Sequence, residues 1–126
     1  MVLHHVSLGT NDLRRAKAFY DPLMSELGLR LIKETERIIA YGLTETVFSI
    51  ERPVNGERAV AGNGTHLAFH AGRRQTVRVC HAAGLANGGK DEGAPGIRSE
   101  YDRNYYAAFL RDPDGNKLEI VTFAAE

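Results

Sequence analysis

The sequence predicts an α+β fold made of two copies of one βαβββ module. The run at 65–70 has the same register as the run at 3–8, and in each a histidine, His66 or His5, opens an apolar stretch typical of a buried strand. The offset is 61 residues, close to half of the 126-residue chain. In both places a short polar break and an apolar pattern of helical period follow the strand. One supersecondary unit therefore occurs twice.

The first copy begins with a strand at 2–9 that is apolar on much of both faces. Thr10 or Asn11 can cap the helix that follows, and Asp12 suits its first turn because a carboxylate there complements the helix dipole. Apolar residues at helical spacing run from Leu13 to Leu27. Three short strands then complete the module, at 29–34, 37–41 and 46–51.

The second copy begins after a segment at 53–64 that is rich in Gly, Pro and Asn, as linkers are. A strand at 66–71 and a helix that ends near Asn87 are followed by an irregular stretch at 90–104, where glycine, proline and charge dominate. The segment 112–116 is a strong turn signal, with Pro at its second position and Gly near its end. It joins the closing strands at 105–111 and 117–123.

Length and composition are those of one globular domain, with 126 residues, 43% hydrophobic and 25% charged. Basic and acidic residues are equal in number, at 16 each, so the positive surface of a nucleic-acid-binding protein is missing. We expect neither a membrane span nor a signal peptide, because no apolar run approaches the ~20 residues that a bilayer requires. We expect one domain over 1–126, with a first module at about 1–52, a linker at 53–64 and a second module at about 65–126.

The single cysteine, Cys80, lies in the second predicted helix beside apolar positions. It has no partner for an internal disulfide, and no neighbouring motif activates it, so we expect a buried and unreactive thiol. This cysteine usage fits a reducing compartment, and we predict a cytoplasmic protein. His81, the next residue of the same helix, is expected on the surface.

The duplication brings four polar positions into correspondence. The first strands contribute His5 and His66, and the last strands contribute Ser49 and Glu119. Because repeats of one unit pack about an approximate two-fold axis, equivalent positions come together. Two imidazoles and one carboxylate can ligate a divalent metal and leave coordination positions open for water or substrate. In the alternative, a metal-free protein, these groups hydrogen-bond one another, since a buried Glu119 needs some partner.

Three motifs support this interpretation: a His-Val-Ser-Leu pattern followed by Asp-Leu and Phe-Tyr near the N-terminus, a Gly-Thr-His-Leu-Ala-Phe strand, and an Asp-Pro-Asp-Gly-Asn-Lys-Leu-Glu closing hairpin. Together they resemble the vicinal oxygen chelate superfamily, which includes glyoxalase I, extradiol dioxygenases, fosfomycin-resistance proteins and bleomycin-binding proteins. The resemblance covers nearly the whole chain. It implies a glyoxalase/dihydroxybiphenyl dioxygenase-like fold, in which two βαβββ modules curl mixed sheets around a metal cleft. It also implies a homodimer, often with modules of different chains completing each site.

The resemblance further implies which residues bind the metal. His5, His66 and Glu119 match the family's two histidines and its terminal glutamate, and the ion would be divalent Fe, Mn, Ni or Zn. Ser49 departs from glyoxalase I, which has a carboxylate at that position. The resulting ligand set is more similar to that of the extradiol dioxygenases or the fosfomycin-resistance enzymes. The dioxygenases usually have four modules, whereas this chain has two, and the basic and potassium-loop features of the fosfomycin branch are not found here.

Other polar side chains are candidates for substrate contacts. Tyr105 and Tyr106 lie on opposite faces of one strand, so one of them should face the cleft, where it can donate a proton to a substrate oxygen. The sequence leaves open which one, and core packing is the alternative for both. His70 shares a strand face with His66, although a surface position fits it equally well. The remaining candidates for substrate binding are Ser49 and, in the long loop, Arg98, Tyr101 and Arg103, whose alternative role is that of solvated charges and surface groups.

Two classes of function follow. In the first, the protein is a metal-dependent enzyme, of lyase, isomerase or ring-cleaving type, whose metal ion binds two adjacent oxygens of a small substrate and stabilises an oxyanion. In the second, it is a binding or drug-resistance protein that holds a small molecule in its dimer cleft without a metal. The retained histidines and glutamate favour the first class. No nucleic acid or membrane is expected as a partner in either.

Overall fold

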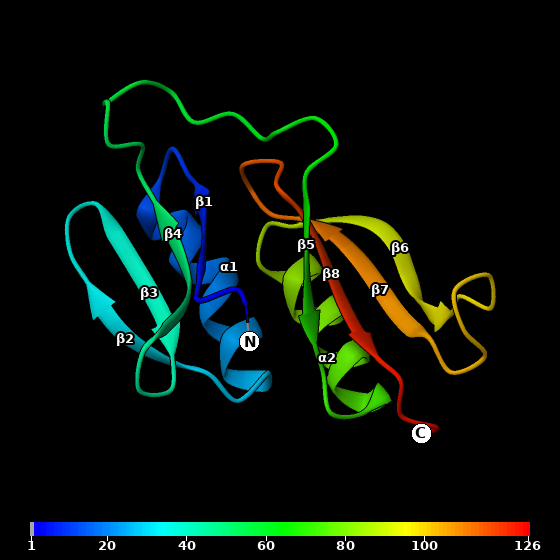
Figure 1. The fold of residues 1–126 in the computed structure, drawn as a ribbon. Helices are drawn as coiled ribbons and strands as arrows, with labels where there is room; N and C mark the ends of the chain where they lie inside the picture. The colour runs from blue at the N-terminus through cyan, green and yellow to red at the C-terminus, as the bar shows by residue number, and fades with distance from the viewer. Residues whose placement is uncertain (1) are drawn as a thin grey trace.

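The computed structural model describes residues 2–126, which form two four-stranded sheets and two helices (Figure 1). The first half of the chain contains β1 (Val6–Gly9), α1 (Leu13–Glu26), β2 (Arg30–Glu34), β3 (Ile38–Gly42) and β4 (Thr46–Glu51). The second half contains β5 (His66–His70), α2 (Arg74–Ala86), β6 (Lys90–Ile97), β7 (Tyr106–Arg111) and β8 (Lys117–Thr122). Both halves are βαβββ modules, as the sequence predicts.

Both sheets are mixed and open, with the strand orders β1-β4-β3-β2 and β5-β8-β7-β6. The first strand of each module runs parallel to the last, and the other pairs are antiparallel. The registers agree residue by residue, because Ser7 lies opposite Ser49 in β1 and β4, just as Ala68 lies opposite Glu119 in β5 and β8. The first and last strands of the two modules therefore correspond as the sequence alignment of the repeats predicts.

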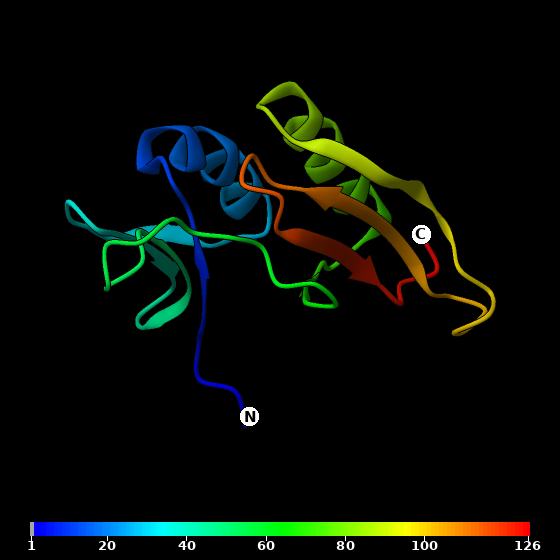
Figure 2. The same ribbon diagram turned by 90° about the horizontal axis from the view of Figure 1, so that it is seen from above.

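The two helices lie on the same side of the sheets and pack against each other (Figure 2). Their inner faces and the inward faces of the strands form one apolar core. Gly84 permits the close approach of α2, because a Cβ atom there would lie 2.7 Å from Leu110 Cδ1 and 3.3 Å from Phe19 Cε1. The largest fully buried side chains are Tyr20, Tyr41, Phe19, Phe48, Leu23, Met24, Ile39, Ile50, Leu110, Leu118, Ile120 and Val77. The face of each sheet turned away from the helices is here called the open face, and no helix or further sheet of residues 2–126 covers it (Figure 2).

Cys80 and His81 are adjacent on α2, and both are buried. Burial raises the pKa of the Cys80 thiol to about 12, which keeps it protonated and unreactive, as expected. The expectation that His81 lies on the surface is wrong. Its Nε2 lies 2.9 Å from Asp91 Oδ1, because this side of α2 packs against β6. Neither helix of residues 2–126 combines the length and the apolar character that crossing a membrane requires.

Strand β6 occupies a stretch where the sequence predicts irregular chain, and this expectation is corrected. Its register with β7 shifts between Asp91 and Gly93 and again between Gly93 and Gly96. Glycine and proline disfavour regular pairing, but an edge strand accepts them where bulges interrupt the ladder. Only the remainder of the predicted irregular stretch, residues 98–104, consists of turns and loop.

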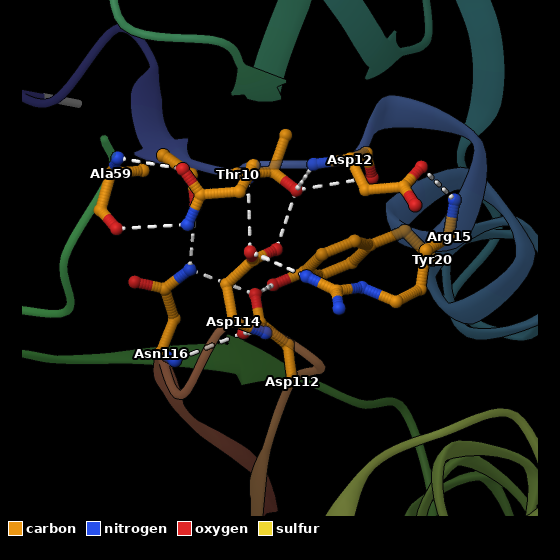
Figure 3. A network of polar contacts seen from close by, with 10 residues as sticks. Thr10, Asp12, Arg15, Tyr20, Ala59, Asp112, Asp114 and Asn116 are labelled. Atoms are coloured by element: carbon orange, nitrogen blue, oxygen red, sulfur yellow. Dashed lines mark hydrogen bonds and ion pairs between the residues drawn. The ribbon is translucent and has the colours of Figure 1, made fainter. Parts of the chain in front are cut away.

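The turn between β7 and β8 joins the second module to the first (Figure 3). The carboxylate of Asp114 accepts hydrogen bonds from the backbone N–H of Asn11 at 2.9 Å, from Arg15 Nη2 at 2.8 Å and from the Thr10 hydroxyl. Thr10 and Asn11 are therefore engaged by the other module. Asp12 caps α1 in their place, with its Oδ1 accepting the Arg15 N–H at 3.0 Å.

A second carboxylate of the same turn, Asp112, is buried beneath this contact. It accepts hydrogen bonds from the Tyr20 hydroxyl of α1 at 2.5 Å and from Asn116 Nδ2 at 2.9 Å (Figure 3). Burial raises the pKa of Asp112 and, together with the nearby carboxylate, raises that of Tyr20. Asn116 also donates to the Gly9 carbonyl at 2.9 Å, so one turn contacts both β1 and α1 of the first module.

Candidate functional site

Glu119 lies at the centre of the open face of the second module. Its neighbours Leu118 and Ile120 point into the core, so the alternation of the strand directs its carboxylate to the opposite side. The residue is only 3% exposed, although it borders a hollow of about 540 Å³. Its Oε1 lies 3.0 Å from His66 Nε2, and the Tyr105 hydroxyl donates to its Oε2. Three of the predicted site residues therefore meet at one point.

Of the two tyrosines at the start of β7, only Tyr105, which directly precedes the strand, lines this hollow. Burial, together with the hydrogen bond to Glu119, raises the pKa of Tyr105 to about 12, so the phenol remains a proton donor at neutral pH. Tyr106 faces the helix side of the sheet, where its hydroxyl accepts a hydrogen bond from Arg78 Nη1 at 3.3 Å. The Arg74 guanidinium lies 5.0 Å from its ring centroid. The orientation left open by the sequence is thus resolved.

Tyr101 and Tyr105 line one side of the hollow, and Phe123 packs against Tyr105 next to it. The ring of Tyr101 lies 5.0 Å from that of Tyr105, which in turn lies 5.3 Å from the ring of Phe123. Tyr101 and Phe123 are 65% and 53% exposed, so much of their apolar surface faces solvent. An exposed aromatic surface next to a polar cluster suits a small ligand with a planar part.

Two cationic side chains complete the lining of this hollow, Arg98 and Lys117. Lys117 is absent from the candidates chosen by sequence, although it precedes Glu119 by two residues and must share its face of β8. His70 lies on the open face at the far end of β5, and it is exposed like Arg103 of the loop. Neither His70 nor Arg103 lines the hollow.

The first module has a separate hollow of about 460 Å³ on its own open face, whose lining includes His5, Ser49 and Glu51. The hydroxyls of Ser7 and Ser49 lie 2.7 Å apart and donate to Glu51 Oε2 at 2.9 and 2.8 Å. Burial opposes the ionisation of Glu51, but hydrogen bonds from Ser49, Ser7 and Arg37 lower its pKa overall. The carboxylate that position 49 lacks is therefore present two residues further along the same face.

The imidazole of His5 borders the same hollow together with that of His4. The two Nδ1 atoms lie 2.8 Å apart, and His4 Nε2 lies 3.3 Å from Glu45 Oε1. Two adjacent residues of a strand would point to opposite faces of the sheet, but these two histidines line one hollow. Both precede β1, which begins at Val6, so the alternation of a strand does not apply to them.

The metal ligands expected from the sequence divide between the two hollows. His66 and Glu119 lie in one hollow, and His5 lies in the other. Within residues 2–126 no group of three or more His, Cys, Asp or Glu side chains is placed to hold a metal ion. A catalytic zinc site, for comparison, has three protein ligands. A single chain thus provides two donors at one place and fits a metal only as half of a site.

The fold and these two hollows define a protein of paired βαβββ modules with polar clusters on the open faces of its sheets. The sequence model of the Glyoxalase/Bleomycin resistance protein/Dioxygenase superfamily matches residues 2–120. The chain belongs to this superfamily, as its motifs predict. Members of the superfamily commonly bind divalent metals and small molecules, and commonly form dimers.

Solved structures agree with this membership. A glyoxalase/bleomycin resistance protein from Albidiferax ferrireducens T118 is 39% identical, with 97% of this chain and 98% of that chain covered and a TM-score of 0.86. A glyoxalase-related enzyme from Fulvimarina pelagi is 20% identical, with coverages of 97% and 88% and a TM-score of 0.74. A lactoylglutathione lyase from Agrobacterium tumefaciens is 19% identical, with coverages of 96% and 92% and a TM-score of 0.66. The last two show the shared fold alone. Among curated proteins, none matches the chain at a significant level.

Proposed function

We propose that this protein is a metal-dependent enzyme that acts on a small substrate with vicinal oxygens, by lyase, isomerase or ring-cleaving chemistry. The observation that carries the proposal is the environment of Glu119. Its carboxylate is almost fully buried, yet it points into an open hollow and is accompanied by the imidazole of His66. A carboxylate and an imidazole at 3.0 Å are a suitable donor pair for a divalent Fe, Mn, Ni or Zn ion.

We infer that His5 of a second copy of the chain supplies the third ligand. His5 and His66 occupy equivalent positions in the two modules, and each borders a hollow on an open face. A homodimer with a two-fold axis that sets the first module of one copy against the second module of the other creates two equal sites. Ser49 and Glu51 then face His66 and Glu119 across the cleft.

The bound metal ion would supply a Lewis acid that polarises the two substrate oxygens. Tyr105 holds the carboxylate of Glu119 in place and keeps its proton available for a substrate oxygen, because its pKa is high. Glu51 stays ionised, because its pKa is lowered, and hydrogen-bonds the Ser49 hydroxyl. This pair is our candidate for accepting a proton from the substrate, a task for which position 49 has no carboxylate of its own.

Mixing two defective variants tests the shared site. His5→Ala and His66→Ala each remove one ligand from every site of their own homodimer, so both variants should bind little metal. In a mixed dimer, one site lacks both histidines and the other keeps both. Refolding an equimolar mixture should therefore restore metal, measured by elemental analysis after dialysis, to about one ion per mixed dimer. If the mixture binds no more metal than the separate variants, the site is not shared between chains.

A metal-free small-molecule binding or resistance protein is the second candidate. It is favoured by one observation, namely that His66, Glu119 and Tyr105 already satisfy one another by hydrogen bonds. Refolding the chain in the presence of Fe, Mn, Ni or Zn and measuring the retained metal separates the two candidates. About one ion per chain is expected for the enzyme. A protein that retains none of the four metals would be assigned to the second class.

Two further proposals concern the chain as a whole. A cytoplasmic location is supported by the single cysteine, whose buried thiol has no disulfide partner. A single domain over 1–126, with modules at about 1–52 and 65–126 and a linker at 53–64, is supported by the packing of α1 on α2 and by the turn contacts of Asp114. One cooperative unfolding transition, seen by two independent spectroscopic probes, is the expected behaviour.

A further inference from the structure

We propose that Arg98 and Lys117 form an anion-binding subsite for the carboxylate or phosphate group of a small substrate with a planar ring. The subsite lies in the hollow that contains Glu119. This inference rests on the proposed function in one respect, namely that the bound substrate reacts beside Glu119. Binding of the anion itself requires no metal, so it can be tested independently of that function.

The Arg98 guanidinium is held in a fixed position by the backbone of β6. Its Nη1 donates to the Gly96 carbonyl and its Nη2 to the Ala94 carbonyl, both at 2.8 Å. Glycines leave the space in which it lies, because a Cβ atom on Gly93 would lie 3.2 Å from Nη2 and one on Gly96 would lie 3.2 Å from Nη1. The remaining N–H groups of the guanidinium stay available, and a fixed guanidinium suits bidentate binding of a carboxylate or phosphate.

The charges of Arg98 and Lys117 are not neutralised within the part of the chain that the structure describes. Neither side chain forms an ion pair, whereas Glu92 of the same hollow pairs with Arg111 at 2.5 Å. Instead, both cations contact one ring: Arg98 Cζ and Lys117 Nζ lie 5.4 and 5.6 Å from the Phe109 centroid. Each contact is favourable, but two positive charges around one ring repel each other. An anion bound beside them relieves that repulsion.

The rest of the lining indicates what the anion is attached to. The exposed ring of Tyr101 lines the hollow next to Tyr105, and Phe123 packs against Tyr105 outside the lining. Tyr105 is itself hydrogen-bonded to Glu119. A ligand anchored at Arg98 therefore places its body against aromatic surface and beside the proposed metal-binding carboxylate. A volume of about 540 Å³ for the hollow limits the ligand to a small molecule. The class that fits is a small aromatic or conjugated anion.

Titration of the metal-free protein with three probes tests this subsite. Benzoate and phenyl phosphate carry a ring and an anion, and benzamide is the neutral counterpart of benzoate. We expect both anions to bind at least about tenfold more tightly than benzamide, by calorimetry or NMR shifts, and more weakly as salt is added. Comparison of the two anions shows whether the subsite prefers a carboxylate or a phosphate.

Variants assign the binding to this subsite. Arg98→Gln and Lys117→Gln should each weaken the anions by about tenfold and leave benzamide unchanged. Arg98→Lys keeps the charge but loses the fork of donors, and should bind with intermediate affinity if the chain folds normally. Arg73→Gln removes an exposed arginine of the same module and should have no effect.

Equal affinity for benzamide and benzoate, or unchanged anion binding in both Gln variants, would overturn the proposal. Metal that is still retained by the Gln variants would show that these substitutions leave the proposed metal site intact.

Discussion

Glu119 shows how a strand can bury an acid without placing it in the core. Its flanking residues fill the apolar interior, and its own side chain lies on the other face beneath an open hollow. The carboxylate is satisfied by two side chains, an imidazole and a phenol, so its burial does not leave an orphaned polar group. Because two side chains satisfy the carboxylate, the effect of a substitution at position 119 on folding can be measured separately from its effect on metal binding.

Glu119→Gln should abolish metal binding and change stability little. The amide keeps an oxygen that can accept the Tyr105 proton and a nitrogen that can donate to His66, so the free energy of unfolding should change by only about 1 kcal/mol. A neutral amide is a poor ligand for a divalent ion, so retained metal should fall to background. Elemental analysis and urea unfolding measure the two effects. Glu92→Gln, in the same hollow but paired with Arg111, should keep its metal.

Tyr105 should titrate about two units above an ordinary tyrosine, because its pKa is raised from 10.0 to about 12. A raised pKa in the folded state means that the stabilising hydrogen bond is fully present below pH 10 and is lost as the pH rises through about 12. Ultraviolet titration of wild type and Tyr105→Phe should differ by one phenol that ionises in this range. A difference spectrum that appears instead near pH 10 would contradict the assignment.

The sequence predicts that His66 and Glu119 meet, but it does not predict that His5 lies in a separate hollow, nor that Lys117 and Glu51 line the two hollows. The repeat predicts the positions of His66 and Glu119, whereas strand alternation alone leaves open whether Tyr105 or Tyr106 faces the cleft. Lys117 could have been found by the same alternation, since it must share the face of Glu119. The Ser7, Ser49 and Glu51 cluster was missed because it depends on which strands are neighbours, and a parallel pairing of β1 with β4 cannot be read from local pattern.

At the scale of elements, the turn between β7 and β8 has two tasks. It reverses the chain, which its Asp-Pro-Asp-Gly-Asn sequence predicts from local turn preferences alone. It also binds the first module, because Asp112, Asp114 and Asn116 form hydrogen bonds with α1, with the segment before it and with β1. This second task was not predictable, because hydrogen bonds between residues about a hundred positions apart leave no local signal.

Asp112→Asn should destabilise the chain by about 1–3 kcal/mol. The carboxylate accepts hydrogen bonds on both oxygens, from Tyr20 and Asn116 on one and from backbone N–H groups on the other. An asparagine side chain has one oxygen and one NH2 group. In either orientation its NH2 group faces N–H or O–H donors, from which it cannot accept a hydrogen bond. Chemical denaturation measures the loss. Asp102→Asn is the matched control, because that exposed carboxylate accepts a single backbone bond and should contribute less than about 0.5 kcal/mol.

Strand β6 illustrates where local pattern misleads. Glycine and proline at 93–96 predict an irregular segment, and this segment would be irregular if it were not paired with another strand. Pairing with β7 nevertheless imposes a strand, and the register shifts twice where residues do not fit the regular ladder. The same glycines accommodate the Arg98 guanidinium, so the irregularity of the sequence reflects a requirement for space rather than for disorder.

At the scale of the whole molecule, one chain carries two different polar clusters on two copies of one module. The duplication was predictable because both copies retain the same strand and helix periods. The two copies differ in where the acid lies on the last strand. In the second module Glu119 lies opposite Ala68, whereas in the first Ser49 occupies the matching position and the acid, Glu51, comes two residues later. The proposed two-fold homodimer would bring both clusters together twice.

Metal binding and dimerisation should therefore be linked. A metal ion that binds only the dimer shifts the monomer–dimer equilibrium toward the dimer by mass action. Sedimentation of dilute protein should show more dimer with added metal and more monomer after treatment with a chelator. The apparent metal affinity should also fall on dilution. Sedimentation that is the same with metal and with chelator at every protein concentration would show that the two processes are independent.

The contact of Thr10 with Asp114 joins positions 104 residues apart, so it forms only when almost the entire chain is available. During synthesis, the segment between β1 and α1 cannot form its hydrogen bonds to the closing turn until the β7–β8 hairpin has left the ribosome. Folding kinetics should register this order: Asp114→Ala is expected to accelerate unfolding while leaving the refolding rate nearly unchanged, as measured by stopped-flow fluorescence. In that case the closing turn makes its contacts with the first module late in folding, and these contacts lengthen the lifetime of the native state.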